Sequence, residues 1–249
     1  MSYRTLGILA ALLALGITVL SRLDVLPGAA WAPLFLSIRI ASLSMLLALV
    51  AGTAFALALH SKRMPARELF DAIVSAPLVL PPTVLGYYLL VALGTESAIG
   101  RAWENLTGTT IVFSFTGAVI AAAVGSLPLV VRSARVALEA VDPSLIAAAR
   151  TLGARPLRVL FTVLLPLAAP GIAAGAMLAF ARALGDYGIT QMVAGQMING
   201  TETASIHVMN ALYGGHEDAA RNMAIVTTVV GISLLYIANR FVRRSSNRV

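Results

Sequence analysis

The sequence predicts an all-α, polytopic membrane protein with about six transmembrane helices. Of its 249 residues, 59% are hydrophobic and only 12% are charged, and the mean hydropathy is +0.88. This composition leaves too few polar side chains to cover a water-soluble globule. The apolar residues gather in stretches close to the roughly 20 residues that a helix needs to cross a bilayer. The expected spans are approximately 6–20, 35–59, 70–93, 109–131, 164–185 and 219–239.

The basic residues fall mainly in alternate segments between these spans, and this asymmetry predicts the orientation. With the N-terminus inside, the cytoplasmic segments hold most of the 18 lysines and arginines. The outer segments keep Arg22, Arg101 and Arg221 among a majority of acidic residues. The positive-inside rule therefore predicts that both termini are cytoplasmic. It also accounts for the net charge of +7 and the pI near 10.5 without a nucleic-acid partner.

The first segment has two interpretations. Arg4, the apolar run 6–20 and the small-residue site Ala30-Trp31-Ala32 also fit a cleaved signal peptide. The later spans keep their orientation in both cases, because the second span begins outside. We expect three parts, namely a first transmembrane helix with its outer loop (1–34), one membrane core (35–240) and a basic cytoplasmic tail (241–249).

The chain carries no recognisable set of catalytic or metal-binding residues. It has no cysteine, which excludes thiolate metal sites and cysteine nucleophiles. His60, His207 and His216 lack the spacing of a metalloprotease site. No segment matches the phosphate loop G-x-x-x-x-G-K-[ST], and Lys62, the only lysine, does not follow glycines. We therefore expect no catalytic residue, metal or cofactor in this chain, and no ATPase activity.

The longest cytoplasmic segment, 132–163, has the signals of ordered structure. Asp142 suits the N-cap of a helix and Pro143 its first position, while Gly153 suits a left-handed C-terminal cap. Pro156 is expected to open a second helix that continues through Val163 into the membrane. The arginines of this segment could serve only to contact anionic lipid. A short capped helix with small residues on one side also suits docking into a groove on a partner protein.

The spacing within this segment resembles the "EAA" signature of type I ABC importer permeases, Glu-Ala-Ala-x3-Gly-x9-Ile-x-Leu-Pro. Ala147 stands at the glutamate position and Val163 at the isoleucine position. The resemblance implies the permease fold of that family, with a coupling helix near 143–153 that docks on a separate ATPase subunit, where ATP and Mg bind. It also implies a permease dimer in a bacterial inner membrane and an external substrate-binding protein, for which 94–108 and 186–218 are candidate docking segments. The candidate coupling residues are Ala147, Ala148, Ala149, Gly153, Val163, Leu165 and Pro166.

Three features inside the spans are candidates for the transport pathway. Pro81-Pro82 breaks the helical hydrogen-bond ladder of the third span, either as a packing kink or where the backbone lines a cavity. Arg182 and Asp186 lie four residues apart and are expected to face each other, as an internally neutralised pair or as part of the pathway. Arg39 lies near the outer end of the second span. Its side chain either extends to the membrane interface or, in a dimer, forms a ring of Arg39 side chains around the pore that favours an oxyanion.

Together these segments resemble the molybdate branch of the permease family. The resemblance rests on Ser37-x-Arg39-x-Ala41, PLVLPPTVLGYYLL at 77–90 and the segments 127–154 and 180–195. Gly185-Asp186-Tyr187-Gly188 stands where that branch usually has Gly-Glu-Phe-Gly, and 196–200 also differs. The resemblance implies ATP-driven import of molybdate by alternating access, with tungstate, sulfate, thiosulfate and ferric iron as alternative substrates.

Two functions of other classes remain as alternatives. A secondary transporter would be expected to carry ionisable residues at mid-membrane and two related halves. An intramembrane enzyme would need a nucleophile and a base that converge within the bilayer. Arg39, Arg182 and Asp186 lie nearer the ends of their spans, and the sequence shows no such pair of reactive residues.

Overall fold

The computed structural model describes residues 31–60, 66–195 and 200–246. Their regular secondary structure is helical throughout, as the composition predicts. The elements in chain order are α2 (Trp31–His60), α3 (Arg67–Val79), α4 (Pro82–Leu93), α5 (Ala98–Thr107), α6 (Phe115–Glu139), α7 (Pro143–Thr151), α8 (Pro156–Val159), a π-helical turn η2 (Leu160–Leu164), α9 (Leu165–Leu184), α10 (Gly188–Ala194), α11 (Ala204–Tyr213) and α12 (Glu217–Ser246).

Four of the expected spans appear as long apolar helices. They are α2, α6, the continuous stretch Pro156–Leu184 and the part Glu217–Ile237 of α12. The expected first span, 6–20, and the possible signal-peptide site at 30–32 lie outside the described residues, except that Trp31 and Ala32 begin α2. The last helix continues to Ser246, so that the expected basic tail begins inside it.

The expected third span, 70–93, is not a straight helix. It consists of α3 and α4, which meet at an angle of 117°. Leu80 and Pro81 are extended, with ψ angles of 138° and 137°. A residue that precedes proline avoids the helical region, and Pro81 and Pro82 both lack the amide hydrogen that would continue the ladder. The proline pair therefore produces the predicted break, together with a sharp change of direction.

The expected boundaries of the fourth span, 109–131, were wrong at both ends. α6 begins at Phe115, after Ser114, whose side chain accepts a hydrogen bond from the Gly117 amide. It continues to Glu139, eight residues beyond the end that the apolar stretch suggests. The charged residues that end the apolar stretch are compatible with a helix, and Ala134 and Leu138 stay buried. The loop predicted to begin at 132 therefore starts only after Glu139.

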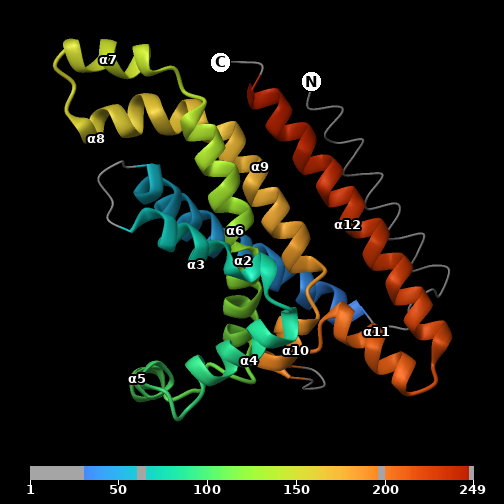
Figure 1. The fold of residues 1–249 in the computed structure, drawn as a ribbon. Helices are drawn as coiled ribbons and strands as arrows, with labels where there is room; N and C mark the ends of the chain where they lie inside the picture. The colour runs from blue at the N-terminus through green and yellow to red at the C-terminus, as the bar shows by residue number, and fades with distance from the viewer. Residues whose placement is uncertain (1–30, 61–65, 196–199, 247–249) are drawn as a thin grey trace.

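The long helices pack through small residues. The most extensive contacts join α2, α6 and α9, and α12 covers α9 (Figure 1). A Cβ atom added at Gly52 of α2 would lie 2.8 Å from Cβ of Val130 in α6, and one added at Gly175 of α9 would lie 2.7 Å from Cβ of Ser133. Such close approach is typical of membrane helices, whose association depends on contact between backbones more than on the exclusion of water.

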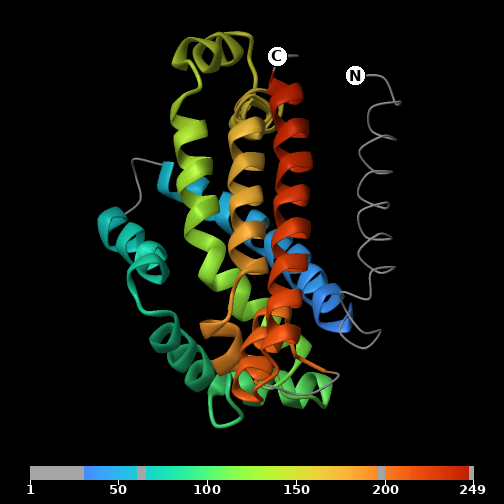
Figure 2. The ribbon, with the colours of Figure 1, turned by 90° about the vertical axis from the view of Figure 1, so that its right-hand side faces the viewer.

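The short helices lie at the two ends of this bundle. α7 and α8 lie at the end where α12 finishes, whereas α5, α10 and α11 lie at the opposite end (Figures 1 and 2). The segments that the positive-inside rule assigns to the cytoplasm, around 150 and after 240, thus share one end. The candidate docking segments for an external protein share the other.

Candidate functional site

The predicted coupling helix forms as α7 and is capped as the sequence predicts. The Ser144 amide donates a hydrogen bond of 2.8 Å to the Asp142 carboxylate, and Pro143 occupies the first turn. This backbone hydrogen bond, with a second from the Ser144 side chain, lowers the pKa of Asp142 below its usual range. At the other end, Gly153 has φ +79° and the Ala154 amide donates to the Ala149 carbonyl. The helix is therefore defined by its own local hydrogen bonds.

The outward side of α7 is not covered by the described part of the chain. No residue of α7 is buried, and Ala147 and Ala148 are exposed. Leu145 and Leu152 are 47% and 88% exposed beside them. An added Cβ at Gly153 would meet no atom within 4 Å. Small and apolar side chains at the end of a projecting helix form a surface that a partner's groove would fit.

The inward side of α7 rests on a group of buried residues that we call the corner cluster. Ile146 is half-buried and packs against it. The cluster consists of Ala56, Leu59, Val74, Val131, Ala134, Leu138, Val141, Leu164, Ala168 and Ile172. It thus joins α2, α3, α6, η2 and α9 beneath α7. Ile146 therefore connects α7 to this cluster.

The second half of the signature lies in the return from α8 to α9, away from the exposed surface of α7. Val163 belongs to η2, Leu165 packs against the corner cluster and Pro166 is exposed in the first turn of α9. The Leu165 amide donates to the Leu160 carbonyl, five residues earlier. A proline ring crowds the carbonyl four residues before it. The wider π turn before Pro166 gives that carbonyl more room. These residues shape the return of the chain into the bundle.

Arg182 and Asp186 form the predicted ion pair. Arg182 Nη1 lies 2.7 Å from Asp186 Oδ1, and the Asp186 side chain is only 2% exposed. The other carboxylate oxygen accepts hydrogen bonds from the Thr190 amide and hydroxyl, at 2.9 and 2.7 Å. The Asp186 carboxylate therefore joins the end of α9 to the beginning of α10. Its charge is balanced by one cation and two neutral donors.

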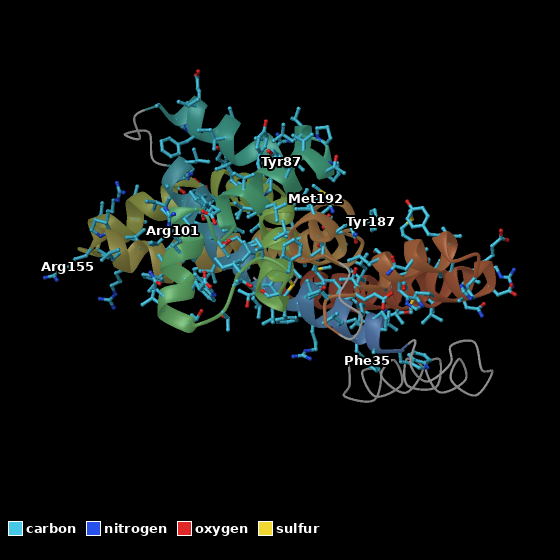
Figure 3. All side chains as sticks on the ribbon, turned by 90° about the horizontal axis from the view of Figure 1, so that it is seen from below. Phe35, Tyr87, Arg101, Arg155, Tyr187 and Met192 are labelled. Atoms are coloured by element: carbon cyan, nitrogen blue, oxygen red, sulfur yellow. The ribbon has the colours of Figure 1, made fainter. Side chains whose placement is uncertain are left out.

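The structure brings the proline pair close to this ion pair through α10. A Cβ atom added at Gly188 would lie 2.8 Å from Cβ of Pro82, and one added at Gly86 would lie 2.7 Å from Cβ of Met192. The first turn of α4 therefore rests on the helix that follows Asp186 (Figure 3). Pro81 and Pro82 are themselves exposed.

Arg39 occupies a different environment. It is exposed on α2, and its guanidinium carbon lies 5.3 Å from the ring centroid of Phe115, at the start of α6. This distance is suitable for a cation–π interaction. Arg39 forms no ion pair with any residue in the described ranges, so that it is not joined to Arg182 and Asp186.

Residues 44–249 match the protein family described as the inner membrane component of binding-protein-dependent transport systems. The chain belongs to this family. It is thus a multi-pass inner membrane permease subunit of the ABC transporter class.

Two relatives of this permease are molybdenum transport system permease proteins named ModB. The protein from Escherichia coli (strain K12) is 44% identical over 207 residues, which is 82% of this chain and 90% of the relative. That from Haemophilus influenzae is 40% identical, over 80% and 88% of the two chains. A chloroplastic sulfate permease of Chlamydomonas reinhardtii is 30% identical over 82% of this chain and 55% of its own length.

Two solved structures share the fold of the permease. The MetNI methionine ABC transporter in an inward-facing conformation matches with a TM-score of 0.65 and 20% identity, over 86% of this chain and 94% of that chain. A bacterial alginate ABC transporter, in complex with an alginate pentasaccharide-bound periplasmic protein, matches with a TM-score of 0.68 and 15% identity, over 88% and 80%. These likenesses confirm the expected ABC importer permease fold.

Sequence reasoning missed two groups of polar residues in the permease. One is Thr190, whose spacing of four from Asp186 was the available signal. The other is an ion-pair network between α3 and α6, in which Arg135 joins Asp71 and Glu139. Asp71 and Arg135 are 64 residues apart, and no local pattern indicates their contact. Within the described ranges, no cluster of three or more histidines and carboxylates could hold a metal ion, and the absence of a cofactor stays a prediction.

Proposed function

We propose that the chain is the membrane-spanning permease subunit of an ATP-driven importer of molybdate. The observation that carries the proposal is the similarity to the molybdenum transport permease of Escherichia coli over most of both chains. The capped and exposed α7 adds independent support, because it provides a docking surface for a separate subunit. No segment of the sequence matches the phosphate loop of ATPases, and in this proposal ATP and Mg bind on that other subunit.

The two halves of the coupling segment have different tasks in this proposal. Ala147, Ala148 and Ala149 enter a groove of the ATPase subunit, and Gly153 allows the sharp turn that keeps the helix projecting. Val163, Leu165 and Pro166 transmit the movement, because they form the return into the bundle. ATP binding draws the coupling helices together and opens the membrane cavity outward, and hydrolysis reverses the change.

The assembly follows from the separation of the two ends. A second copy of the permease completes the pathway, and an external binding protein delivers the anion at the end that carries α5 and α11. We place the C-terminus in the cytoplasm, because the basic segments around 150 and after 240 share the α7 end, and the positive-inside rule assigns the N-terminus to the same side. Pro81, Pro82, Arg182 and Asp186 form a connected group beside the pathway, and Arg39 contributes a positive charge near its outer entrance.

Uptake of labelled molybdate tests the proposal directly. Cells that lack this chain should lose uptake, and restoring the gene should recover it. Excess tungstate should block the recovered uptake, whereas excess sulfate should not. Unchanged molybdate uptake with a defect in sulfate uptake would contradict the proposed substrate and favour sulfate, the substrate named for the Chlamydomonas permease. Uptake without any ATPase subunit would favour a secondary transporter.

A further inference from the structure

The helix α3 has few apolar contacts with the rest of the described chain. Val74 is its only buried residue, and it belongs to the corner cluster. Leu69, Phe70 and Ile73 of the same helix are all more than 40% exposed. Yet α3 is the first half of the bent pair, and its second half, α4, rests on α10 beside the Arg182–Asp186 pair. The position of α3 therefore affects the candidate pathway.

An ion-pair network attaches α3 to α6. Arg135 Nη1 on α6 lies 2.9 Å from Asp71 Oδ2 on α3, and Arg135 Nε lies 3.0 Å from Glu139 Oε1. Arg67 Nη2, at the start of α3, lies 3.8 Å from the same Glu139 oxygen. These four residues form the α3–α6 network, in which positive and negative charges alternate. One guanidinium that donates through two nitrogens to carboxylates on two helices restricts their relative orientation.

The network lies immediately before the coupling helix. Only Ala140, Val141 and the cap residue Asp142 separate Glu139 from α7. The Ala140 amide donates to the Val136 carbonyl, and Val141 is buried in the corner cluster, against which Ile146 of α7 also packs. This short connection is held in place, because the Ala140 amide is hydrogen-bonded and the Val141 side chain is buried. We therefore expect a movement of α7 to be passed to the last turn of α6 and the charges on it.

We propose that Asp71, Arg135 and Glu139 are positioning residues, which fix α3 to the corner of α6 and α7 so that these helices move as one body. Displacement of α7 by the ATPase subunit then moves the bent α3–α4 pair and, through α10, the pathway. The inference rests on the proposed function and adds the route by which coupling reaches the membrane. Apolar contact through Val74 alone would hold α3 near α6 but would not fix its orientation, because hydrophobic attraction is not directional.

The coupling ratio provides the test. The permease is reconstituted in proteoliposomes with its ATPase subunit and binding protein, and molybdate imported per ATP hydrolysed is measured. Arg135→Gln should lower this ratio by about fivefold. The ATPase subunit should still co-purify, because the exposed face of α7 is unchanged. Glu68→Gln is the matched control, since Glu68 is an exposed residue of α3 that forms no ion pair in the described ranges, and it should keep the original ratio.

A covalent link separates a positioning role from a purely structural one. The chain has no cysteine, so that Asp71→Cys with Arg135→Cys introduces the only two thiols. This double variant should be poorly coupled, and a short, reducible bifunctional thiol reagent should restore the ratio to within about twofold of the unaltered complex. Reduction of the link should abolish the recovery.

Two results would overturn the inference. The first is a coupling ratio in Arg135→Gln equal to that of the unaltered complex. The second is a link between α3 and α6 that blocks import, because the two helices would then have to separate during transport. Failure of the proposed function would give a different result, because the unaltered complex itself would then import no molybdate.

Discussion

The α7 surface and the Arg182–Asp186–Thr190 group are the two candidate functional regions, and they differ in how deeply their residues are buried. α7 has no buried residue, and only Ile146 packs inward while Leu145, Ala147 and Ala148 are exposed. Asp186 is almost completely buried, and both its oxygens are bonded within the described chain. Changes in the first region should therefore alter assembly with little effect on the fold of the subunit. Changes in the second should alter the fold and transport together.

The largest effect is expected from Asp186→Ala. The change leaves Arg182 without its anion and removes the acceptor for two donors of Thr190. Asp186 is buried, but 33% of the Arg182 side chain is exposed and can be hydrated, so that the cost should come mainly from the unpaired Thr190 donors, at about 2 kcal/mol. We expect a large loss of folded protein, measured by thermal unfolding in detergent. Asp218→Ala is the control, because its pair with Arg221 is exposed on both sides and should contribute less than about 1 kcal/mol.

Replacing both members of the pair separates its two possible roles. Arg182→Leu with Asp186→Leu removes the unpaired charge as well as the pair, and it should recover much of the stability. If the pair contributes to the pathway, molybdate uptake should remain absent in this double variant. Normal uptake would show that the two charges only neutralise each other and take no part in transport.

The second effect, Gly153→Trp, concerns the exposed region. The glycine has φ +79°, but an added side chain meets no atom of the described chain within 4 Å. We expect the permease to insert normally and the ATPase subunit to be lost, with uptake lowered about tenfold or more. Gly108→Trp is a matched control at the opposite end, with φ +70° and the same open space. Co-purification of the ATPase should distinguish the two variants, and retention by both would contradict the docking role.

A smaller effect is expected from Thr190→Val. The change removes one hydroxyl donor to Asp186 but leaves the Thr190 amide bonded, so that it should lower stability by about 1 kcal/mol. Thr227→Val is the comparison, because the Thr227 hydroxyl is buried without a partner in the described part of the chain. That variant should unfold at the same temperature as the original protein or at a higher one. Equal destabilisation by both changes would argue against a specific role for Thr190.

The smallest effect concerns the pH dependence of α7. Because the pKa of Asp142 is lowered in the folded state, its cap stabilises α7 above the unfolded pKa, near 3.9. The contribution is lost as the pH falls through the lower folded value. Hydrogen exchange at the Ser144 amide should therefore accelerate in acid relative to Asp142→Asn, which keeps a cap without a titrating group. If exchange at the Ser144 amide had the same pH dependence in both proteins, the Asp142 carboxylate would not be the cause of the acceleration in acid.

The two regions also differ in how much of them the sequence predicts. The caps of α7 depend on Asp142, Pro143 and Gly153, which act on neighbouring amides, so that local rules were sufficient. The pairing of Arg182 with Asp186 followed from a spacing of four. Thr190 lies four residues after Asp186 and the same spacing could have indicated it, but an uncharged hydroxyl is a weaker signal than a pair of opposite charges. Only the folded chain shows that Gly188 rests on Pro82.

The wrong boundaries predicted for α6 have a separate cause. Hydropathy indicates where a segment is apolar, whereas hydrogen bonding decides where a helix stops. α6 continues past Arg132 because its buried face persists through Ala134 and Leu138. The contact of Arg135 with Asp71 appears only when that extended end packs on α3. The proline pair predicted a break between α3 and α4, but not the angle of 117° between them.

The π-helical turn at Leu160–Leu164 has a consequence for the register of the whole coupling segment. A π turn accommodates about one residue more than the corresponding α-helical turn. Deleting Phe161, which is exposed there, would allow the stretch to close into a regular α-helix without breaking it. Because the extra residue is held within that one turn, the helix phase before and after it would stay nearly the same, whereas deleting a residue from the regular part of α9 would rotate everything before it by about 100° relative to the rest of the helix. The second protein would keep every residue and spacing of the signature and present the wrong side of α7, so that the phase of the helix is as much a part of the signature as its letters.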